Sequence, residues 1–154
     1  MTDSLRCVLG IDPGVTGGIA FLWPDGKLVA DDIPVVDGEV NIDRLVTEIK
    51  LCNPHVAIVE RASSRPGQGV SSTFKYGAAY GALRAACVVL GIPHHLVSPA
   101  KWKKHFLLDK DKEKSRGLAI RLWPGAKCFD RKKDHGRAEA ALIAKYGADV
   151  VLRK

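Results

Sequence analysis

The stretch Cys7-Val8-Leu9-Gly10-Ile11-Asp12-Pro13-Gly14 decides the fold that the sequence predicts. Its apolar first half indicates a buried strand, and the Pro-Gly pair after Asp12 allows the chain to turn sharply. A second strand is expected over Gly18–Trp23 and a third near Leu28–Val36, with a glycine-containing turn between them. The three segments predict an antiparallel meander in which the first strand ends at the Asp12 carboxylate.

Helical and strand patterns alternate after the meander. Apolar residues at helical spacing predict a crossover helix over Asn41–Leu51, and the β-branched run Val56–Val59 predicts a parallel strand buried on both faces. A long helix over Val70–Leu90 and a short strand over His95–Val97 follow. Three more helices are expected, over Pro99–Phe106, Lys112–Leu122 and His135–Tyr146. This order predicts an α/β fold in which helices flank a mixed five-stranded sheet of three antiparallel meander strands plus parallel strands, all in one domain over residues 1–154.

Charge is distributed unevenly along the chain. The net charge is +7, but residues 1–92 carry 8 basic and 10 acidic side chains, whereas residues 93–154 carry 16 and 7. The first part is therefore slightly acidic and the second strongly basic. A basic region attracts polyanions, and nucleic acid is the usual one, although a solvated or lipid-contacting surface gives the same count.

Neither a membrane span nor a secretory signal is expected. The longest run without a charged residue, Ala85–Ala100, is broken by glycine and proline, and Met1–Arg6 lacks the basic start and apolar segment of a signal peptide. The sequence therefore predicts a cytoplasmic protein without membrane contact. Its four cysteines have no paired spacing, which favours small buried side chains over a zinc site or disulfides.

Three acidic residues occupy positions where a carboxylate is unusual. Asp12 and Glu60 each end an apolar strand, and Glu139 lies among small and apolar residues of the last helix. Asp12 could bond its own turn, and Glu60 could pair with Arg61 or Arg65. Acids that converge from separate elements instead indicate two divalent cations held by carboxylates and water, a site suited to phosphodiester cleavage.

The motifs around these acids resemble the RuvC-like Holliday junction resolvases of the ribonuclease H-like superfamily. Gly10-Ile11-Asp12-Pro13-Gly14 is similar to the family's first-strand motif, and Ile58-Val59-Glu60 to its fourth-strand acid. Three segments extend the likeness to the phage-type and plant chloroplast branch: Gly69-Val70-Ser71-Ser72-Thr73-Phe74, Trp102-Lys103-Lys104-His105-Phe106 and Lys132-Lys133-Asp134-His135-Gly136-Arg137-Ala138-Glu139-Ala140. The resemblance covers nearly the whole chain and implies a ribonuclease H-like fold.

The resemblance also implies an activity and its metals. It implies a homodimeric crossover junction endodeoxyribonuclease that nicks opposed strands of a four-way DNA junction, using two Mg²⁺ or Mn²⁺ ions per active site. The protein would act in the cytoplasm, as a bacterial or phage-encoded enzyme. In this interpretation Asp12 bridges both metals, Glu60 holds one, and Glu139 and Asp134 hold the other.

The identity of the fourth group of the site is open between Asp134 and His135. Five residues separate Asp134 from Glu139. A regular helix turns through about 500° over that length, so both acids reach one metal pair only if Asp134 lies at or before the helix start. His135 precedes Glu139 by four residues and shares its face, as a metal ligand or proton shuttle. Helix geometry and the family likeness favour Asp134.

Basic and loop residues are the candidates for DNA contact. The loop over residues 63–69 lies where the family inserts side chains at the junction centre, which favours Gln68 and Val70. Lys132 and Lys133, next to the acids, either offset phosphate charge or form a solvated pair. The predicted DNA-binding set is Gln68, Val70, Lys101, Lys103, Lys104, Lys112, Arg116, Arg131, Lys132, Lys133 and Arg137.

Two helices carry patterns with more than one explanation. Small residues between Gly77 and Ala86 would let another helix approach closely, either from a second copy or from within the subunit. Trp102 and Phe106 lie four residues apart on one helical face, which favours core anchors over base-stacking side chains.

Other functional classes fit less well. Sugar-kinase and actin-like ATPases begin with a similar strand and hairpin, but they need two lobes and a longer chain. A junction-binding protein without cleavage activity would not need the three acids. A related ribonuclease H-like nuclease that cuts forks, flaps or RNA–DNA hybrids remains the alternative, because a metal site of this kind fixes the chemistry and not the substrate.

Overall fold

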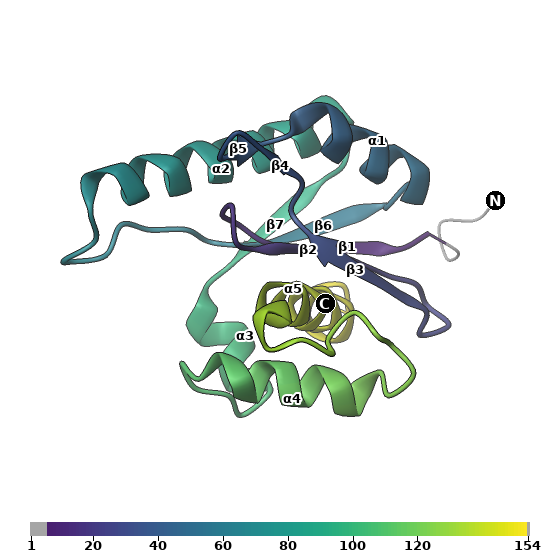
Figure 1. Ribbon diagram of the computed structural model, residues 1–154. Coiled ribbons are helices and arrows are strands. Elements are labelled where there is room, and N and C mark those ends of the chain that lie inside the picture. Colours follow the sequence, from purple (N-terminus) through teal and green to yellow (C-terminus); the bar gives the residue numbers. More distant parts are fainter. Residues whose placement is uncertain (1–5, 154) are drawn as a thin grey trace.

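The computed structural model describes residues 6–153, so predictions about the first five residues lie outside it. Within this range, five strands form one central mixed sheet (Figure 1): β1 (Val8–Asp12), β2 (Gly18–Leu22), β3 (Leu28–Asp32), β6 (Val56–Glu60) and β7 (His94–Val97). The strand order is β3-β2-β1-β6-β7. The first three strands pair antiparallel, whereas β1–β6 and β6–β7 pair parallel. The predicted fold class is confirmed.

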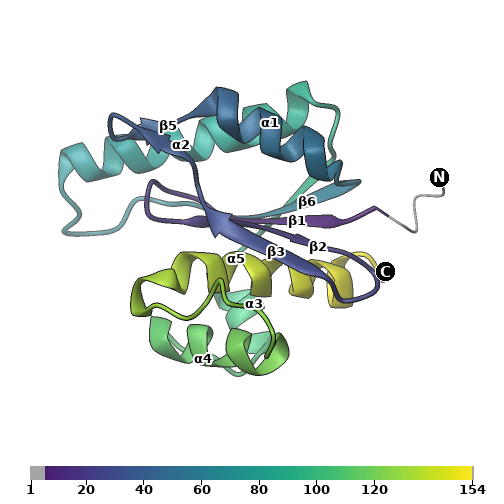
Figure 2. The same ribbon diagram turned by 45° about the vertical axis from the view of Figure 1, so that its right-hand side comes forward.

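Helices cover both faces of the sheet (Figures 1 and 2). One layer contains α1 (Ile42–Cys52) and α2 (Val70–Val89), and the other contains α3 (Pro99–His105), α4 (Lys112–Leu122) and α5 (His135–Tyr146). The short helices η2 (Lys132–Asp134) and η3 (Gly147–Val151) flank α5. None of the described helices is long and apolar enough to cross a membrane.

Side chains that alternate along the strands pack into hydrophobic clusters on both faces of the sheet. Leu9 and Ile11 of β1 are buried under α1 and α2, whereas Val8 packs with Ile58 and Trp102 on the opposite face. Successive side chains of a strand point to opposite faces, so a central strand covered on both sides is apolar throughout. The same geometry leaves polar residues of β1 and β6 only at their carboxyl ends, where Asp12 and Glu60 lie.

The third predicted strand is shorter than expected. Instead of Leu28–Val36, β3 ends at Asp32, and a separate hairpin of β4 (Val35–Val36) and β5 (Glu39–Val40) follows. Pro34 has no amide proton for a ladder, so the strand breaks before it. Asp37 and Gly38 have φ values of 52° and 78°, as the tight turn of a hairpin requires.

Helices α4 and α5 have the predicted bounds, and the other remaining elements differ from the predicted ranges by one residue at one or both ends. Asn41 caps α1 rather than belonging to it, since its side chain accepts from the Arg44 amide. The cysteines are all free thiols; Cys7 and Cys87 are buried as expected, whereas Cys52 and Cys128 are half-buried.

Two glycines let α5 lie directly on the sheet. A Cβ atom on Gly10 of β1 would lie 2.2 Å from the Ala140 carbonyl oxygen of α5. A Cβ atom on Gly136, in the first turn of α5, would lie 2.7 Å from the carbonyl oxygen of Thr16 in the loop after β1. This close approach brings the first half of α5 next to the end of β1.

Candidate active site

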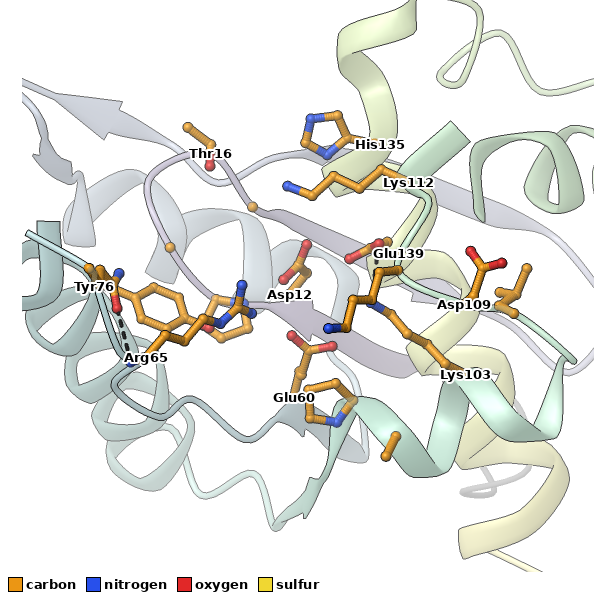
Figure 3. Close-up of a pocket in the computed structure, with 18 of the residues that line it drawn as sticks. Asp12, Thr16, Glu60, Arg65, Tyr76, Lys103, Asp109, Lys112, His135 and Glu139 are labelled. Atoms are coloured by element: carbon orange, nitrogen blue, oxygen red, sulfur yellow. Dashed lines mark hydrogen bonds and ion pairs between the residues drawn. The ribbon is translucent and has the colours of Figure 1, made fainter. Parts of the chain in front are cut away.

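Three carboxylates meet at one end of the sheet. Asp12 ends β1, Glu60 ends β6, and Glu139 projects from α5 toward them (Figure 3). One oxygen from each carboxylate lies within 4.8 Å of the others. The parallel register that pairs Ile11 with Val59 places the two strand-end acids side by side. The sequence-based prediction that these acids converge is confirmed by this geometry.

The three acids are poorly solvated and repel one another. Glu60 and Glu139 are 6% and 5% exposed. Burial, followed by the nearby charges of Glu60 and Glu139, holds the pKa of Asp12 well above its ordinary value. Burial is also the main cause that raises the pKa of Glu60. A cluster of this kind needs a cation to be stable in its ionised form.

The donor set suits a divalent cation. Carboxylate oxygens are the ligands that Mg²⁺ and Mn²⁺ prefer. Oε1 of Glu139 is buried and has no hydrogen-bond partner among residues 6–153, although the Lys103 ammonium lies 4.0 Å away. An acceptor left unpaired in this way is costly to bury unless another group satisfies it. Asp12, Glu60 and Glu139 are therefore the residues that could hold a metal.

One side of the site is formed by α3. Trp102 is fully buried, and its indole N–H donates to Oε2 of Glu60 at 2.7 Å. The adjacent Lys103 places its ammonium 5.4 Å from the centre of the Trp102 ring. The prediction that Trp102 is a core anchor is confirmed, but its hydrogen bond was missed. A buried indole needs an acceptor, and that requirement was the available signal.

The acids open into a cavity of about 1050 Å³. Arg65 and Tyr76 line it on the α2 side, and Lys103 and Lys112 line it on the side of α3 and α4 (Figure 3). Burial and the nearby charges of Glu60 and Asp12 raise the pKa of Tyr76 to about 12. Arg65 and Tyr76 were not predicted as pocket residues, because the path of the loop before α2 and the side of α2 that faces the strand ends depend on tertiary packing.

Asp134 does not join the other acids. It lies at the start of α5, as predicted, but its carboxylate accepts from the Arg131 backbone N–H at 2.8 Å and from the Arg131 guanidinium at 2.8 Å. Burial opposes ionisation, but these hydrogen bonds and the charge of Arg137 hold the pKa of Asp134 below its ordinary value. Asp134 lies outside the group of acids that could hold a metal, and it is not among the residues lining the cavity. The structure therefore assigns Asp134 to the helix start rather than to the acidic cluster.

The alternative fourth group, His135, does line the cavity. It lies one turn before Glu139 on the same face of α5, close to Thr16 and Lys112 in Figure 3. The choice of Asp134 over His135 rested on helix geometry and on the family likeness, and neither shows where the side chain points. The bonds from Arg131 decide where the Asp134 side chain points.

The predicted DNA-binding residues fall into three groups. Gln68, Lys103, Lys104 and Lys112 line the cavity. Three arginines are instead engaged within the fold: Arg116 with Glu113 and the Phe129 carbonyl, Arg131 with Asp134, and Arg137 with Asp32. The others, Val70, Lys101, Lys132 and Lys133, are exposed. DNA contact by any of these residues stays a prediction.

Comparison with known proteins gives matches only among solved structures. No protein-family model and no curated protein matches the chain. RuvC of Thermus thermophilus in complex with a Holliday junction substrate has a TM-score of 0.71 at 18% identity, over 94% of this chain and 95% of that one. A second Thermus thermophilus RuvC structure gives 0.63 at 20% identity, over 95% and 97%. The yeast mitochondrial Holliday junction resolvase gives 0.52 at 21% identity, over 91% and 76%. The chain has the ribonuclease H-like fold of RuvC, as the sequence motifs predicted.

Proposed function

We propose that this protein is a Holliday junction resolvase, a metal-dependent endonuclease that makes paired, symmetric nicks in four-way DNA junctions. The observation that carries the proposal is the buried acidic cluster with its unpaired Glu139 oxygen, at the mouth of a basic cavity. The fold adds support, because it is shared with RuvC, which has been solved with a junction substrate. Its place in the phage-type branch, its single-domain extent and its cytoplasmic location stay predictions.

The proposed metal site uses three acids and one imidazole. Two Mg²⁺ or Mn²⁺ ions, when bound, would orient and activate the attacking water and stabilise the leaving oxygen. Asp12 lies between Glu60 and Glu139 in Figure 3, so it is the residue that would contact both ions. We assign the fourth position to His135, because Arg131 already occupies the Asp134 carboxylate.

Lysines of the cavity would hold the phosphate. The positive charges of Lys112 and Lys103 act on Asp12 strongly enough to oppose the rise of its pKa. Lys103 is 21% exposed at its side chain, and Lys112 is exposed. Both ammonium groups can therefore reach a phosphate that lies over the acids and offset its charge. Gln68 and Lys104, on the cavity wall, are proposed to contact the same strand.

A second copy of the chain is proposed to pack on the outer face of α2. Val70, Phe74 and Val88 are 89%, 75% and 64% exposed there. Gly77 and Gly81 lie on the same face, and nothing would lie within 4 Å of an added Cβ atom at either position. Two glycines inside a helix weaken it by about 1 kcal/mol each, and a close helix contact would explain them. A two-fold symmetric dimer would present two sites to the two symmetric cuts of a junction.

The proposed function is tested with a panel of DNA substrates. The protein and its Asp12→Asn variant are incubated with a mobile four-way junction, a fork, a flap, a linear duplex and an RNA–DNA hybrid, in Mg²⁺ or in EDTA. Paired nicks confined to the junction, dependent on metal and absent in the variant, are expected. Cutting of forks, flaps or hybrids instead would assign the site to a related nuclease. Junction binding without cleavage in Mg²⁺ or Mn²⁺ would contradict the enzymatic proposal.

A further inference from the structure

The two oxygens of Glu60 have different surroundings. Oε2 accepts the indole N–H of Trp102 at 2.7 Å, whereas the described residues donate no hydrogen bond to Oε1; the carboxylate belongs to the acidic cluster with Asp12 and Glu139. The Trp102 ring is fully buried and packs with Val97 and Ile58. Its position is therefore fixed by the core, and the N–H cannot turn away from the carboxylate without disturbing that packing.

The start of α3 also fixes the Trp102 indole. Pro99 occupies the first turn of α3, and the Ser98 side chain accepts from the Lys101 amide, which caps the helix. The strand β7 ends at Val97, directly before this cap. The indole is thus attached to the sheet next to β6 through a short and rigid connection, and the donor has little freedom to move.

A carboxylate held in this way presents its other oxygen to a metal most readily. Oε2 keeps a second lone pair, but a turn of the group that brings both oxygens to the ion would weaken the indole hydrogen bond, and leaving the buried N–H unpaired costs about 1–3 kcal/mol. Mg²⁺ binds carboxylates mostly through one oxygen, in octahedral geometry at about 2.0–2.1 Å. Ca²⁺ takes more ligands at longer distances and often uses both oxygens of a carboxylate. The hydrogen bond therefore favours the smaller ion.

We propose that Trp102 is a positioning residue that restricts Glu60 to binding through one oxygen and so makes the site selective for Mg²⁺ and Mn²⁺ over Ca²⁺. The inference rests on the proposed metal site. Partners of metal ligands typically change metal affinity by about 10- to 100-fold when they are removed. Lys103 cannot replace Trp102 in this role, because its ammonium lies 4.0 Å from Glu139 and donates no hydrogen bond to Glu60 among the described contacts.

The test compares two variants that truncate the same ring. Trp102→Phe removes the N–H, whereas Trp102→His keeps a ring nitrogen at the equivalent position although it loses more volume. Dissociation constants for Mg²⁺, Mn²⁺ and Ca²⁺ are measured by isothermal titration calorimetry on the full chain at pH 8, without DNA. In Trp102→Phe we expect the preference for Mn²⁺ over Ca²⁺ to fall by about 10-fold or more. In Trp102→His we expect the parent ratio. An unchanged ratio in Trp102→Phe would overturn the proposal.

Trp123→Phe is the control for a tryptophan truncation remote from the acids. Trp123 packs against Phe129, with ring centres 6.2 Å apart, and contacts the same core as Trp102. We expect its metal affinities to equal those of the parent, and thermal denaturation reports whether each variant is folded. A change of metal preference in Trp123→Phe as large as that in Trp102→Phe would overturn the proposal.

A structural measurement on the parent protein does not depend on any variant folding. In crystals soaked with Mn²⁺, Glu60 is expected to bind through one oxygen while Oε2 stays at hydrogen-bond distance from the indole. Coordination through both oxygens would overturn the proposal. If the parent protein binds no divalent ion, the proposed function itself is contradicted. If both proteins bind ions and Trp102→Phe has the parent ratio of Mn²⁺ to Ca²⁺ affinity, only the role of Trp102 is contradicted.

Discussion

Asp134 and Glu139 lie five residues apart in the chain and are 1% and 5% exposed, yet their surroundings are opposite. Asp134 accepts hydrogen bonds from the backbone and the guanidinium of Arg131. Glu139 has an oxygen without any hydrogen-bond donor in the described part of the chain, and it faces two further acids. Asp134 has both hydrogen-bond donors and a counter-charge in Arg131. Among residues 6–153, Glu139 has only the Lys103 ammonium, 4.0 Å away and not hydrogen-bonded to its Oε1. The comparison shows that the partners of a buried carboxylate, rather than its burial, separate a structural role from a functional one.

The largest effect is expected at the acidic cluster. Asp12→Asn removes the carboxylate proposed to contact both ions, so Mn²⁺ affinity and junction cleavage should each fall by more than about 100-fold. In EDTA the same variant should unfold at a higher temperature than the parent, because one of three repelling acids is neutral. Calorimetry and thermal denaturation measure both effects. Asp130→Asn, at an exposed position, is the control and should change neither.

The next effect is expected where α5 touches the loop after β1. Gly136→Ala places a Cβ atom 2.7 Å from the Thr16 carbonyl, so α5 must shift and carry His135 and Glu139 with it. We expect cleavage to fall by about 10-fold or more and stability by about 1–3 kcal/mol, measured by single-turnover kinetics and urea denaturation.

Gly117→Ala in α4 is the matched control for that substitution. Its Cβ atom would meet only the end of the Arg121 side chain, at 3.6 Å. A slight stabilisation is expected there from the better helix former. Equal losses in both alanine variants would show that the contact between Gly136 and Thr16 does not position the site.

Substitution of Asp134 is expected to change stability in the opposite direction from substitution of Asp12. Asp134→Asn removes the charge that Arg131 and Arg137 surround, so the free energy of unfolding should fall by about 1–3 kcal/mol. Urea denaturation in EDTA measures it. A variant as stable as the parent would show that these ion pairs contribute nothing and that the comparison of the two regions fails.

The smallest expected effect concerns how the free energy of unfolding depends on pH, which differs between the acidic cluster and Asp134. The pKa values of Asp12 and Glu60 are raised from 3.8 and 4.5, so the unfolded chain loses these protons first, and the metal-free protein should lose stability as the pH rises above about 4. Asp134 has a lowered pKa, so its contribution is present above 3.8 and is lost as the pH falls below that value.

Denaturation of the parent and both asparagine variants across pH separates these contributions. In Asp12→Asn the free energy of unfolding should decline less steeply as the pH rises above 4. In Asp134→Asn it should fall less as the pH drops below 4. Each carboxyl contributes at most about 1.4 kcal/mol per pH unit. The same slope in all three proteins would contradict the assigned directions.

Much of this fold and part of its site could be predicted from local sequence patterns. The apolar runs of β1 and β6 predicted both strands and placed Asp12 and Glu60 at neighbouring ends, because parallel strands align their carboxyl ends. The hairpin over residues 35–40 was missed although its Asp-Gly turn is a strong local signal. The roles of Asp134 and Trp102 depend on side-chain directions set by tertiary contacts, which spacing along the chain does not contain.

The most direct test of the contrast between the two buried acids is single-turnover cleavage of a mobile four-way junction by Glu139→Gln and Asp134→Asn in parallel with the parent. The account predicts that Glu139→Gln leaves the junction intact and that Asp134→Asn, assayed at a temperature where it is folded, cleaves within about threefold of the parent rate. Loss of cleavage in folded Asp134→Asn together with parent-like cleavage by Glu139→Gln would contradict it.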